Sequence, residues 1–405
     1  MKRSSILLVV ALLLMVVSIG SFAQDPASTT LGTIFAPAST IGLRPGMPYT
    51  PLWIVKSDSA NYPPNAETAG SVACIYGVTP LTAGCPKNGT PLATGGAKAI
   101  AVVDYGHTST LQSDFDTFNA HFGLPTQTLQ FICDCGSCPS NNGTGWDVET
   151  SLDVEWSHAM APNAQIIVAQ FCNDPFEGGK SAAEYLAGTA VAAAGGGEVS
   201  NSFGYGGEAG VGSGTEMMWD QYMQVNGVVY FTSAGDDGLG PDYPSVSPYT
   251  VSAGGTHIIR DGSGNLTGES CWSGSGGGIS LYEALPQYQL IIGNITGPKR
   301  GTPDMSAIAD PNTGVGVYST TGCNGWCQVG GTSVSSPVLA GVVNAAGSFF
   351  NLTERQLSKA YGEYRTPGIY HQDFFDVISG SNGSPAKVGW DQCTGLGSPR
   401  KQAGF

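Results

Sequence analysis

The sequence predicts a doubly wound α/β fold in which a mostly parallel sheet is flanked by helices. The run over 228–233 is apolar enough for a strand buried on both faces, and a Gly-rich loop follows it. Val148, Leu152 and Ala159 lie on one face of a helix, which indicates an amphipathic helix. A second apolar run, over 338–343, follows a Gly-Gly turn and continues a helix.

The chain begins with the pattern of a secretory signal peptide. A basic Met-Lys-Arg start is followed by an apolar run over 6–17 and by Ser-Phe-Ala at 21–23, so cleavage is expected before Gln24. The apolar run is short for a membrane span, and no later stretch is long enough. We therefore expect a secreted protein, extracellular or periplasmic, without a membrane anchor.

Residues 24–64 are rich in Pro, Ser, Thr and Ala and show no periodic pattern, which is typical of an extension or linker. A single domain over 65–405 is predicted to follow, long for one domain but acceptable for this fold class.

A carboxylate pair lies on the helix predicted around 149–156. Glu149 and Asp153 are four residues apart, so their side chains lie one turn above the other beside the apolar stripe. Two ionised carboxylates at this distance repel, but they become favourable when they share one proton, an arrangement suited to acid–base chemistry. The spacing alone equally fits a solvated acidic helix face.

The loop after the strand over 228–233 carries Asp236. Functional residues of open α/β sheets lie at such carboxyl ends of strands. An aspartate donates a hydrogen bond only when it is protonated. By itself, Asp-Asp-Gly at 236–238 is also an ordinary turn sequence.

Ser333 is predicted to lie at the start of a helix. Gly330 and Gly331 allow a tight turn before it, and Pro337 falls in the first turns, where a missing N–H costs little. Unpaired N–H groups and the positive end of the helix dipole suit a developing oxyanion. The simpler alternative is an ordinary Ser/Thr helix cap.

A nucleophilic serine needs a base, and no histidine offers one by its context. Ordinary subtilisins carry theirs in a His-Gly-Thr-His segment, which this chain lacks. The five histidines are His107, His121, His158, His257 and His371.

Taken together, these residues resemble the sedolisins, the serine-carboxyl peptidases of subtilisin-like fold. The resemblance extends from about Tyr76 to Pro399. It rests on an ordered series of motifs: the predicted first core strand over 99–104, the helix over 149–162, Ser-Asn-Ser-Phe-Gly at 200–204, Ser-Ala-Gly-Asp at 233–236, Tyr-Pro-Ser at 243–245, Ser-Ala-Gly-Gly-Thr at 252–256, Pro-Asp-Met-Ser-Ala at 303–307 and the segment around Ser333.

The resemblance implies roles for four residues. Ser333 would be the nucleophile and Glu149 the general base. Asp153 would orient Glu149 and share its proton, and Asp236 would complete the oxyanion hole.

The resemblance also implies a substrate-binding edge at Ser202, Phe203 and Gly204, which would pair with extended substrate backbone. Phe203 stands where a tryptophan is expected. Sedolisins usually carry a long folded prodomain, and here 24–64 would be a reduced propeptide at most.

The C-terminal segment contains a candidate calcium site. Two aspartates flank a Gly/Asn/Ser-rich loop, and carboxylates with backbone carbonyls form the oxygen cage that calcium prefers. The family uses two aspartates and three carbonyls, which here implies one ion held by Asp376, Val377, Lys387, Gly389 and Asp391. From spacing alone, a polar surface loop is the safer interpretation.

The chain contains 10 cysteines, and disulfides are the default in an oxidising compartment. Cys74–Cys85 and Cys323–Cys327 are plausible local pairs. The cysteine-rich run over 133–138 suggests zinc, but no second His or Cys cluster supports it.

Charge excludes some partners. The formal net charge is −15, and loss of Lys2 and Arg3 with the signal leaves 14 basic and 31 acidic residues, or −17. Such a chain should not bind nucleic acid or anionic lipid. Few basic groups also mean little repulsion once the carboxylates are neutralised in acid.

The sequence therefore predicts a monomeric, secreted, acid-acting serine-carboxyl endopeptidase whose partners are protein or peptide substrates. Two alternatives remain. One is a neutral subtilisin-like peptidase that uses an unrecognised histidine, and the other is a catalytically inactive secreted binding module on the same scaffold.

Overall fold

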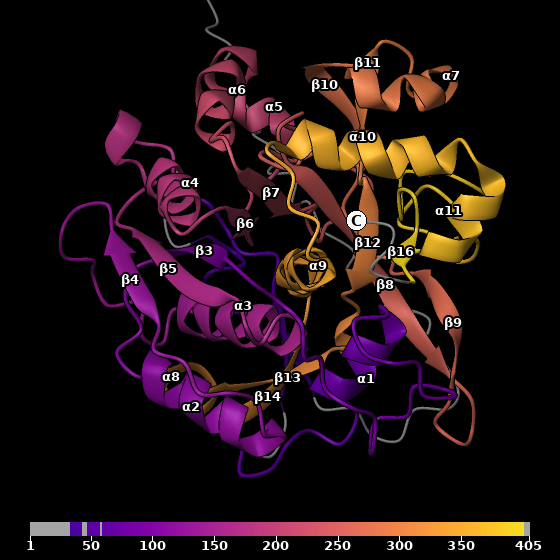
Figure 1. The fold of residues 1–405 in the computed structure, drawn as a ribbon. Helices are drawn as coiled ribbons and strands as arrows, with labels where there is room; N and C mark the ends of the chain where they lie inside the picture. Colours follow the sequence, from indigo (N-terminus) through magenta and orange to yellow (C-terminus); the bar gives the residue numbers. More distant parts are fainter. Residues whose placement is uncertain (1–32, 43–46, 57–58, 401–405) are drawn as a thin grey trace, which may run out of the picture. The chain divides into compact units, whose positions relative to one another are not determined.

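The central sheet of the computed structural model is parallel except at one edge, as predicted. Its strand order is β12-β8-β7-β6-β3-β5-β4, and β9 pairs antiparallel with β8. The bounds are β3 (Ala99–Tyr105), β4 (Gln130–Cys133), β5 (Gln165–Phe171), β6 (Gly197–Asn201), β7 (Val228–Ser233), β8 (Val251–Arg260), β9 (Leu266–Cys271) and β12 (Met305–Ile308). Figure 1 traces these strands through the molecule.

The structure describes residues 33–42, 47–56 and 59–400. The expected signal peptide at 1–23 lies outside them. In the described part, no helix is both long and apolar enough to cross a membrane.

A second, antiparallel sheet has the order β1-β2-β14-β13. Its strands are β1 (Ile34–Phe35), β2 (Trp53–Val55), β13 (Val315–Ser319) and β14 (Gly325–Gly330). Two strands thus come from the segment that we expected to be an extension, and the chain from Gly32 onward forms one unit. The domain boundary at residue 64 stays a prediction. Two further pairs are β10 (Gly278–Ala284) with β11 (Lys299–Thr302), and β15 (Phe374–Phe375) with β16 (Ser398–Pro399).

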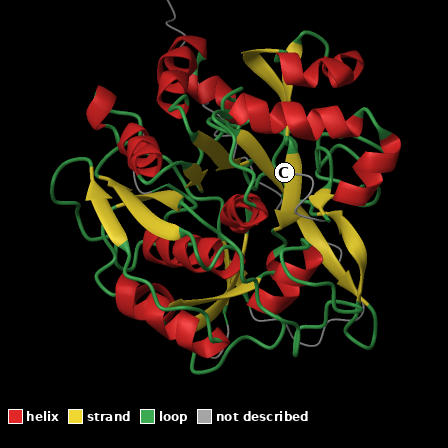
Figure 2. Ribbon diagram, in the orientation of Figure 1, coloured by secondary structure: helices red, strands yellow, loops and turns green. Residues whose placement is uncertain are grey.

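Helices surround and separate the sheets (Figure 2). They are α1 (Ala69–Ile75), α2 (Leu111–Phe122), α3 (Trp146–Met160), α4 (Ala183–Ala193), α5 (Glu208–Val211), α6 (Ser213–Trp219), α7 (Gly293–Thr296), α8 (Thr320–Cys323), α9 (Thr332–Ala346), α10 (Thr353–Tyr364) and α11 (Pro367–Asp373).

Helix α3 is buried on every side, which corrects the expectation of an amphipathic helix. All residues of Trp146–Met160 are buried. The helix packs on β3, on the neighbouring α9, and on β13 and α2, so no face is left for water (Figure 1). The carboxylates of α3 therefore cannot form a solvated acidic face.

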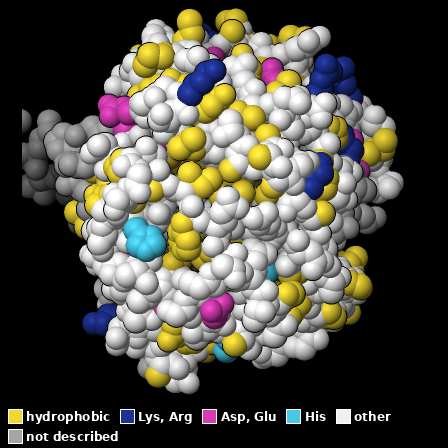
Figure 3. Space-filling model, turned by 60° about the vertical axis from the view of Figure 1, so that its left-hand side comes forward, with side chains coloured by type: hydrophobic (Ala, Val, Ile, Leu, Met, Phe, Trp, Pro, Cys, Tyr) yellow, Lys and Arg dark blue, Asp and Glu magenta, His cyan; other side chains and the backbone are white. Residues whose placement is uncertain are grey.

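The surface carries few charges. Figure 3 shows one face on which scattered Lys, Arg, Asp and Glu side chains stand among neutral and apolar ones, consistent with a charged fraction of only 12%.

All ten cysteines lie in disulfides, and no described cysteine is free. Both expected pairs, Cys74–Cys85 and Cys323–Cys327, are confirmed. The other bonds are Cys133–Cys138, Cys135–Cys172 and Cys271–Cys393, so the run over 133–138 is paired in disulfides.

Candidate active site

Ser333 is the second residue of α9, directly after the turn at Gly331. Gly331 has a φ of +113°, and a Cβ there would lie 2.0 Å from the Pro51 carbonyl oxygen, so only glycine fits. The Ser333 side chain is fully buried, and its hydroxyl has no hydrogen-bond partner among the described residues. Its backbone N–H donates to the carbonyl of Pro51 at 3.2 Å.

Pro337 explains a second contact of this turn. A residue at 337 with an N–H would bond to the carbonyl of Ser333 four residues earlier, but proline has none. That carbonyl lies instead 3.3 Å from the Ser202 hydroxyl. The same hydroxyl is 2.9 Å from Asp153 Oδ1, so Ser202 bridges the nucleophile turn and the carboxylate helix.

Glu149 and Asp153 lie on α3 without a basic partner. Burial raises the pKa of both carboxyls well above their ordinary values, and the nearby Asp104 raises them further. For Glu149, the adjacent hydroxyls of Ser333 and Thr50 offset part of the rise. Those hydroxyls lie close enough to affect the pKa, but neither Glu149 oxygen makes a hydrogen bond of good distance and angle with a described residue. A buried carboxylate without such partners is held ready to accept or to carry a proton.

Asp104 is a third carboxylate of this cluster; it is the last residue of the strand predicted over 99–104, and no role was predicted for it. It lies near the carboxyl end of β3, and burial raises its pKa to about 8. Neither of its oxygens has a partner among the described residues. Its position at the end of a buried parallel strand was the signal that could have identified it.

Asp236 follows β7 and meets the start of α9. Its Oδ1 accepts from the Thr332 N–H at 2.8 Å and from the Thr332 hydroxyl at 2.9 Å. Its Oδ2 is buried without a partner. A Cβ added to Gly331 would lie 2.6 Å from that Oδ2 and 2.0 Å from the Pro51 oxygen, so the two atoms face the same small space. Burial raises the pKa of Asp236 to about 7.

No described histidine hydrogen-bonds to Ser333. His158 bonds the Pro125 carbonyl, and burial lowers its pKa to about 4. His107 contacts Gln170, and His257 pairs with Asp310 at 2.9 Å. The described geometry thus provides no serine–histidine pair.

The expected substrate edge, Ser202 to Gly204, continues from β6. Gly204 exchanges two backbone hydrogen bonds with Tyr49, at 2.9 and 3.0 Å, as an antiparallel strand would. The Phe203 side chain is fully buried in an aromatic cluster with Phe171 and Phe176, so it does not line a pocket. Gly204 therefore presents its backbone at this edge.

A cavity of about 160 Å³ adjoins the edge. Half of its twelve lining residues are glycines, and the others include Tyr49, Leu239, Pro241, Asp237 and Asp242. The Tyr49 hydroxyl donates to Asp242 Oδ2 at 2.8 Å.

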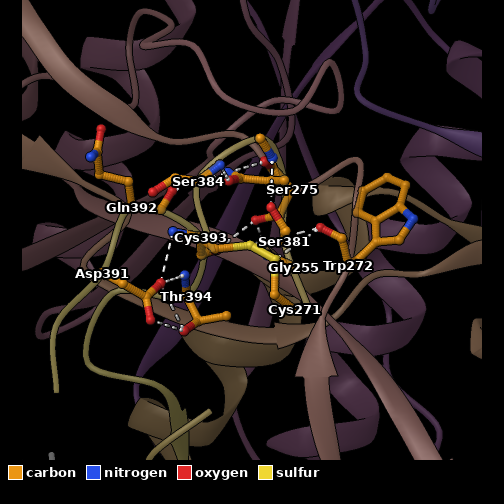
Figure 4. The surroundings of a disulfide bond; sticks show 12 residues. Gly255, Cys271, Trp272, Ser275, Ser381, Ser384, Asp391, Gln392, Cys393 and Thr394 are labelled. Carbon is orange, nitrogen blue, oxygen red and sulfur yellow. Dashed lines mark hydrogen bonds between the residues drawn. A yellow bond between two sulfur atoms is a disulfide. The ribbon is translucent and has the colours of Figure 1, made fainter. Parts of the chain in front are cut away.

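The C-terminal loop folds around the two expected aspartates. Asp391 accepts from the N–H groups of Lys387, Cys393 and Thr394 at 2.8–2.9 Å; the last two bonds are drawn in Figure 4, beside the Cys271–Cys393 disulfide.

Asp376 accepts from the N–H of Gly389 at 3.1 Å, so both carboxylates face one loop. Among the described residues, no hydrogen bond is donated to the carbonyl oxygens of Val377, Lys387 and Gly389. Two carboxylates and three free carbonyls fit a calcium ion.

The chain is similar in sequence to several known peptidases. No family model matches the chain. Kumamolisin of a Bacillus species is 32% identical over 208 residues, 43% of this chain and 35% of that protein. Sedolisin of a Pseudomonas species is 29% identical over 207 residues, 43% of this chain and 34% of that protein. The matches thus span about a third of these relatives' length.

Among solved structures, Pseudomonas sedolisin in complex with two molecules of pseudo-iodotyrostatin superposes with a TM-score of 0.66. The match covers 83% of this chain and 95% of that one. At 24% identity, it shows that the two chains share a fold. The subtilisin-like fold predicted from the sequence is therefore confirmed.

Proposed function

The chain belongs to the sedolisin family of serine-carboxyl peptidases, and we propose that it is an acid-acting endopeptidase that hydrolyses peptide bonds through an acyl-enzyme. The observation that carries this proposal is the convergence of Ser333, Glu149 and Asp236 from three separate elements on one buried space. In the described structure, no basic side chain is hydrogen-bonded to the carboxylate of Glu149 or to that of Asp236.

Glu149 acts as the general base in this mechanism. Its carboxylate takes the proton of the Ser333 hydroxyl as the oxygen attacks the substrate carbonyl carbon. It then gives that proton to the leaving amine, and a water repeats the sequence to release the acyl group. Asp153 and Asp104 lie near Glu149 and raise its pKa or have their own raised. The protonation of Glu149, Asp153 and Asp104 is therefore coupled, and the three carboxyls titrate together.

The oxyanion would be stabilised by the Ser333 N–H and by Asp236 Oδ2. The second donor exists only while Asp236 is protonated. Since burial raises the pKa of Asp236 to about 7, the donor is present in acid and is lost as pH rises past neutrality. This requirement sets the alkaline limit of activity, and the acid limit lies where the coupled carboxyls of Glu149 and Asp153 can no longer lose a proton to act as the base.

We propose one calcium ion in the C-terminal loop. Asp376 and Asp391 would bind it through their carboxylates, and Val377, Lys387 and Gly389 through their carbonyls. Bound there, the ion would neutralise two carboxylates and hold the loop on the domain, with no part in the reaction.

We propose further that the protein is secreted and monomeric, with the signal peptide at 1–23 and protein or peptide substrates. The five disulfides support an oxidising compartment.

The test is digestion of an unfolded protein from acid to mildly alkaline pH, with Ser333→Ala beside the wild type. Ser336→Ala is the matched control, since Ser336 is a buried serine of the same helix that contacts Ser200 and not the carboxylate cluster. Acid activity lost only in Ser333→Ala supports the proposal. An optimum at or above neutral pH would favour the histidine alternative, and inactivity of the wild type at every pH would favour a binding module.

A further inference from the structure

Four cysteine sulfurs meet at one edge of the parallel sheet. Cys133 is the last residue of β4, the strand at that edge, and Cys172 follows directly on the last residue of β5. The two strands pair in parallel with Cys133 opposite Gln170 (Figure 1), so their carboxyl ends lie side by side. Two more cysteines lie in the turn after β4. We call the four residues the sulfur cluster: Cys133, Cys135, Cys138 and Cys172.

The turn after β4 brings its two cysteines back to the end of the strand. Gly136 has a φ of +82°, which glycine adopts without strain, and its N–H donates to the Cys133 carbonyl at 3.2 Å. The two residues between Cys135 and Cys138 give a spacing that zinc sites use. The sequence alone offered no further ligand, because Cys172 lies far along the chain. The pairing of β4 with β5 supplies it as the fourth sulfur.

The sulfurs that are not bonded to each other already lie at the distances of a metal site. Cys133 Sγ is 3.7 Å from Cys135 Sγ and 3.9 Å from Cys172 Sγ. Cys172 Sγ is 3.4 Å from Cys138 Sγ, and all four sulfurs lie within 4.8 Å of one another. Four sulfurs held at about 2.3 Å from a tetrahedral zinc ion are about 3.8 Å apart. Only the two bonded pairs must separate for the cluster to take this shape.

An ion can reach the sulfur cluster from solvent. Cys135 is exposed, and the other three cysteines are half-buried. A cavity of about 240 Å³ adjoins them, with Cys135 and Cys172 in its wall. Carboxylates in the same wall attract a cation; they belong to Asp134, Asp174 and Glu177.

We propose that the sulfur cluster is a zinc site in the thiol form of the chain, and that oxidation to the two disulfides expels the ion. Each thiol loses its proton to water as its sulfur binds, and four thiolates complete the tetrahedral shell. While bound, the ion keeps these four thiols together and apart from the remaining cysteines.

Oxidation then exchanges the ion for two covalent bonds. Two disulfide bonds of a disulfide oxidant accept the four electrons of the four thiolates and become four thiolates themselves. Cys133–Cys138 and Cys135–Cys172 form, and the ion leaves with its charge unchanged. This inference is independent of the proposed function, because no residue of the sulfur cluster belongs to the candidate active site.

The test uses the full chain, reduced with a phosphine at neutral pH in the absence of oxygen. Co²⁺ is added as a spectroscopic probe and Zn²⁺ as its competitor. We measure the cobalt–thiolate absorption, the number of ions per chain by mass spectrometry, and the cysteines that the ion shields from alkylation. Cys172→Ser removes the fourth ligand. The matched control carries Cys323→Ser and Cys327→Ser, which remove a disulfide outside the sulfur cluster.

The reduced wild type should bind one ion, with the absorption of a tetrahedral thiolate site, and Zn²⁺ should displace Co²⁺. The four cysteines of the sulfur cluster should be shielded from alkylation, and a disulfide oxidant should return the ion to solution. Cys172→Ser should weaken binding at least about 100-fold, since even a partner outside the ligand shell is worth about 10–100-fold. The control should bind as the wild type does.

Three results would overturn the zinc site. They are no ion on the reduced wild type, equal affinity in Cys172→Ser, and shielding of Cys323 and Cys327 in place of the sulfur cluster. The alkylation map is made on the wild type, so it decides the question even if Cys172→Ser does not fold.

Discussion

Two buried pairs in this molecule have the same spacing and opposite electrostatics. Glu149 and Asp153 are four residues apart on α3, and both are acids. Arg300 and Asp304 are also four apart, fully buried, and joined by two contacts of 2.8 and 3.2 Å. Asp304 also accepts from Tyr361 and from the N–H of Ser252.

The difference separates a structural pair from a functional one. A buried carboxylate with a cation and several donors is satisfied and has no reason to exchange protons. The carboxylates of α3 have no cation, and burial raises their pKa values instead. Spacing in the sequence is therefore less informative than the partner that the fold supplies.

Removing Glu149 should have the largest effect on activity. Glu149→Gln should lower kcat about 10⁴-fold or more, since the base is lost. Peptide turnover in acid is measured. Glu155→Gln is the control, because Glu155 is a buried acid of the same helix that accepts from the N–H of Tyr318. Near-normal turnover in Glu149→Gln would refute the assigned base.

The same variant should be more stable than the wild type at alkaline pH. The folded-state pKa of Glu149 is raised, so its stabilising proton is present in acid and is lost as pH rises through the folded-state value. Glutamine does not ionise, so Glu149→Gln does not lose this stability at alkaline pH. Denaturant unfolding at acid and alkaline pH measures the difference.

Breaking the other pair should instead destabilise the fold. Arg300→Met leaves Asp304 buried without its cation, which typically costs about 3–5 kcal/mol. Denaturant midpoints at neutral pH measure the loss, while the folded fraction should keep its peptide turnover. A much smaller loss of stability would mean that the neutral hydrogen-bond donors alone stabilise the Asp304 carboxylate. The two buried pairs would then differ less than their partners indicate.

Asp236 should set the alkaline limb of activity. The wild type should lose turnover as pH passes through about 7, where the donor deprotonates, and one lost oxyanion donor costs about 10²–10³-fold in rate. Asp236→Asn keeps a donor that does not titrate, so its limb should move to higher pH even if its rate is lower. A limb at the same pH in both proteins would assign the titration to another group.

Calcium removal should have the smallest effect, and on stability only. A ligand bound only to the folded state adds about 2.7 kcal/mol at roughly 100 times its Kd. Chelator should lower Tm, and Asp391→Ala should reproduce the loss. The exposed Asp116 on α2 supplies the control, as Asp116→Ala should still respond to chelator. An unchanged Tm with no calcium in the purified protein would remove the site.

Much of the candidate site was predictable because its signals are local. A glycine turn followed by an apolar run places Ser333 at a helix start, and a spacing of four puts Glu149 and Asp153 on one helix face. The short loops of Cys74–Cys85 and Cys323–Cys327 made those disulfides predictable as well. The roles of the site residues stay predictions until variants are measured.

Other features were not predictable from local pattern. The place of Asp104 at the end of a buried strand made it a candidate, but its proximity to the carboxylates of α3 is decided only when β3 is placed beside α3. Phe203 was predicted to belong to the substrate-binding edge, but its ring lies in the aromatic core. The amphipathic interpretation of α3 failed because a second sheet covers the face that would otherwise meet water.

The sequence by itself determined the chemical groups and their short-range geometry: a serine at a helix start, two acids on one helix face, an acid after a buried strand, and a sedolisin-like order of motifs. Only the tertiary structure decided which acids lack a cation, that Asp104 joins the cluster, and that Tyr49 to Leu52 lie against Ser333. The physical reason is that burial and partnership depend on residues far apart in the chain, whereas local sequence constrains only neighbours within a turn or a strand.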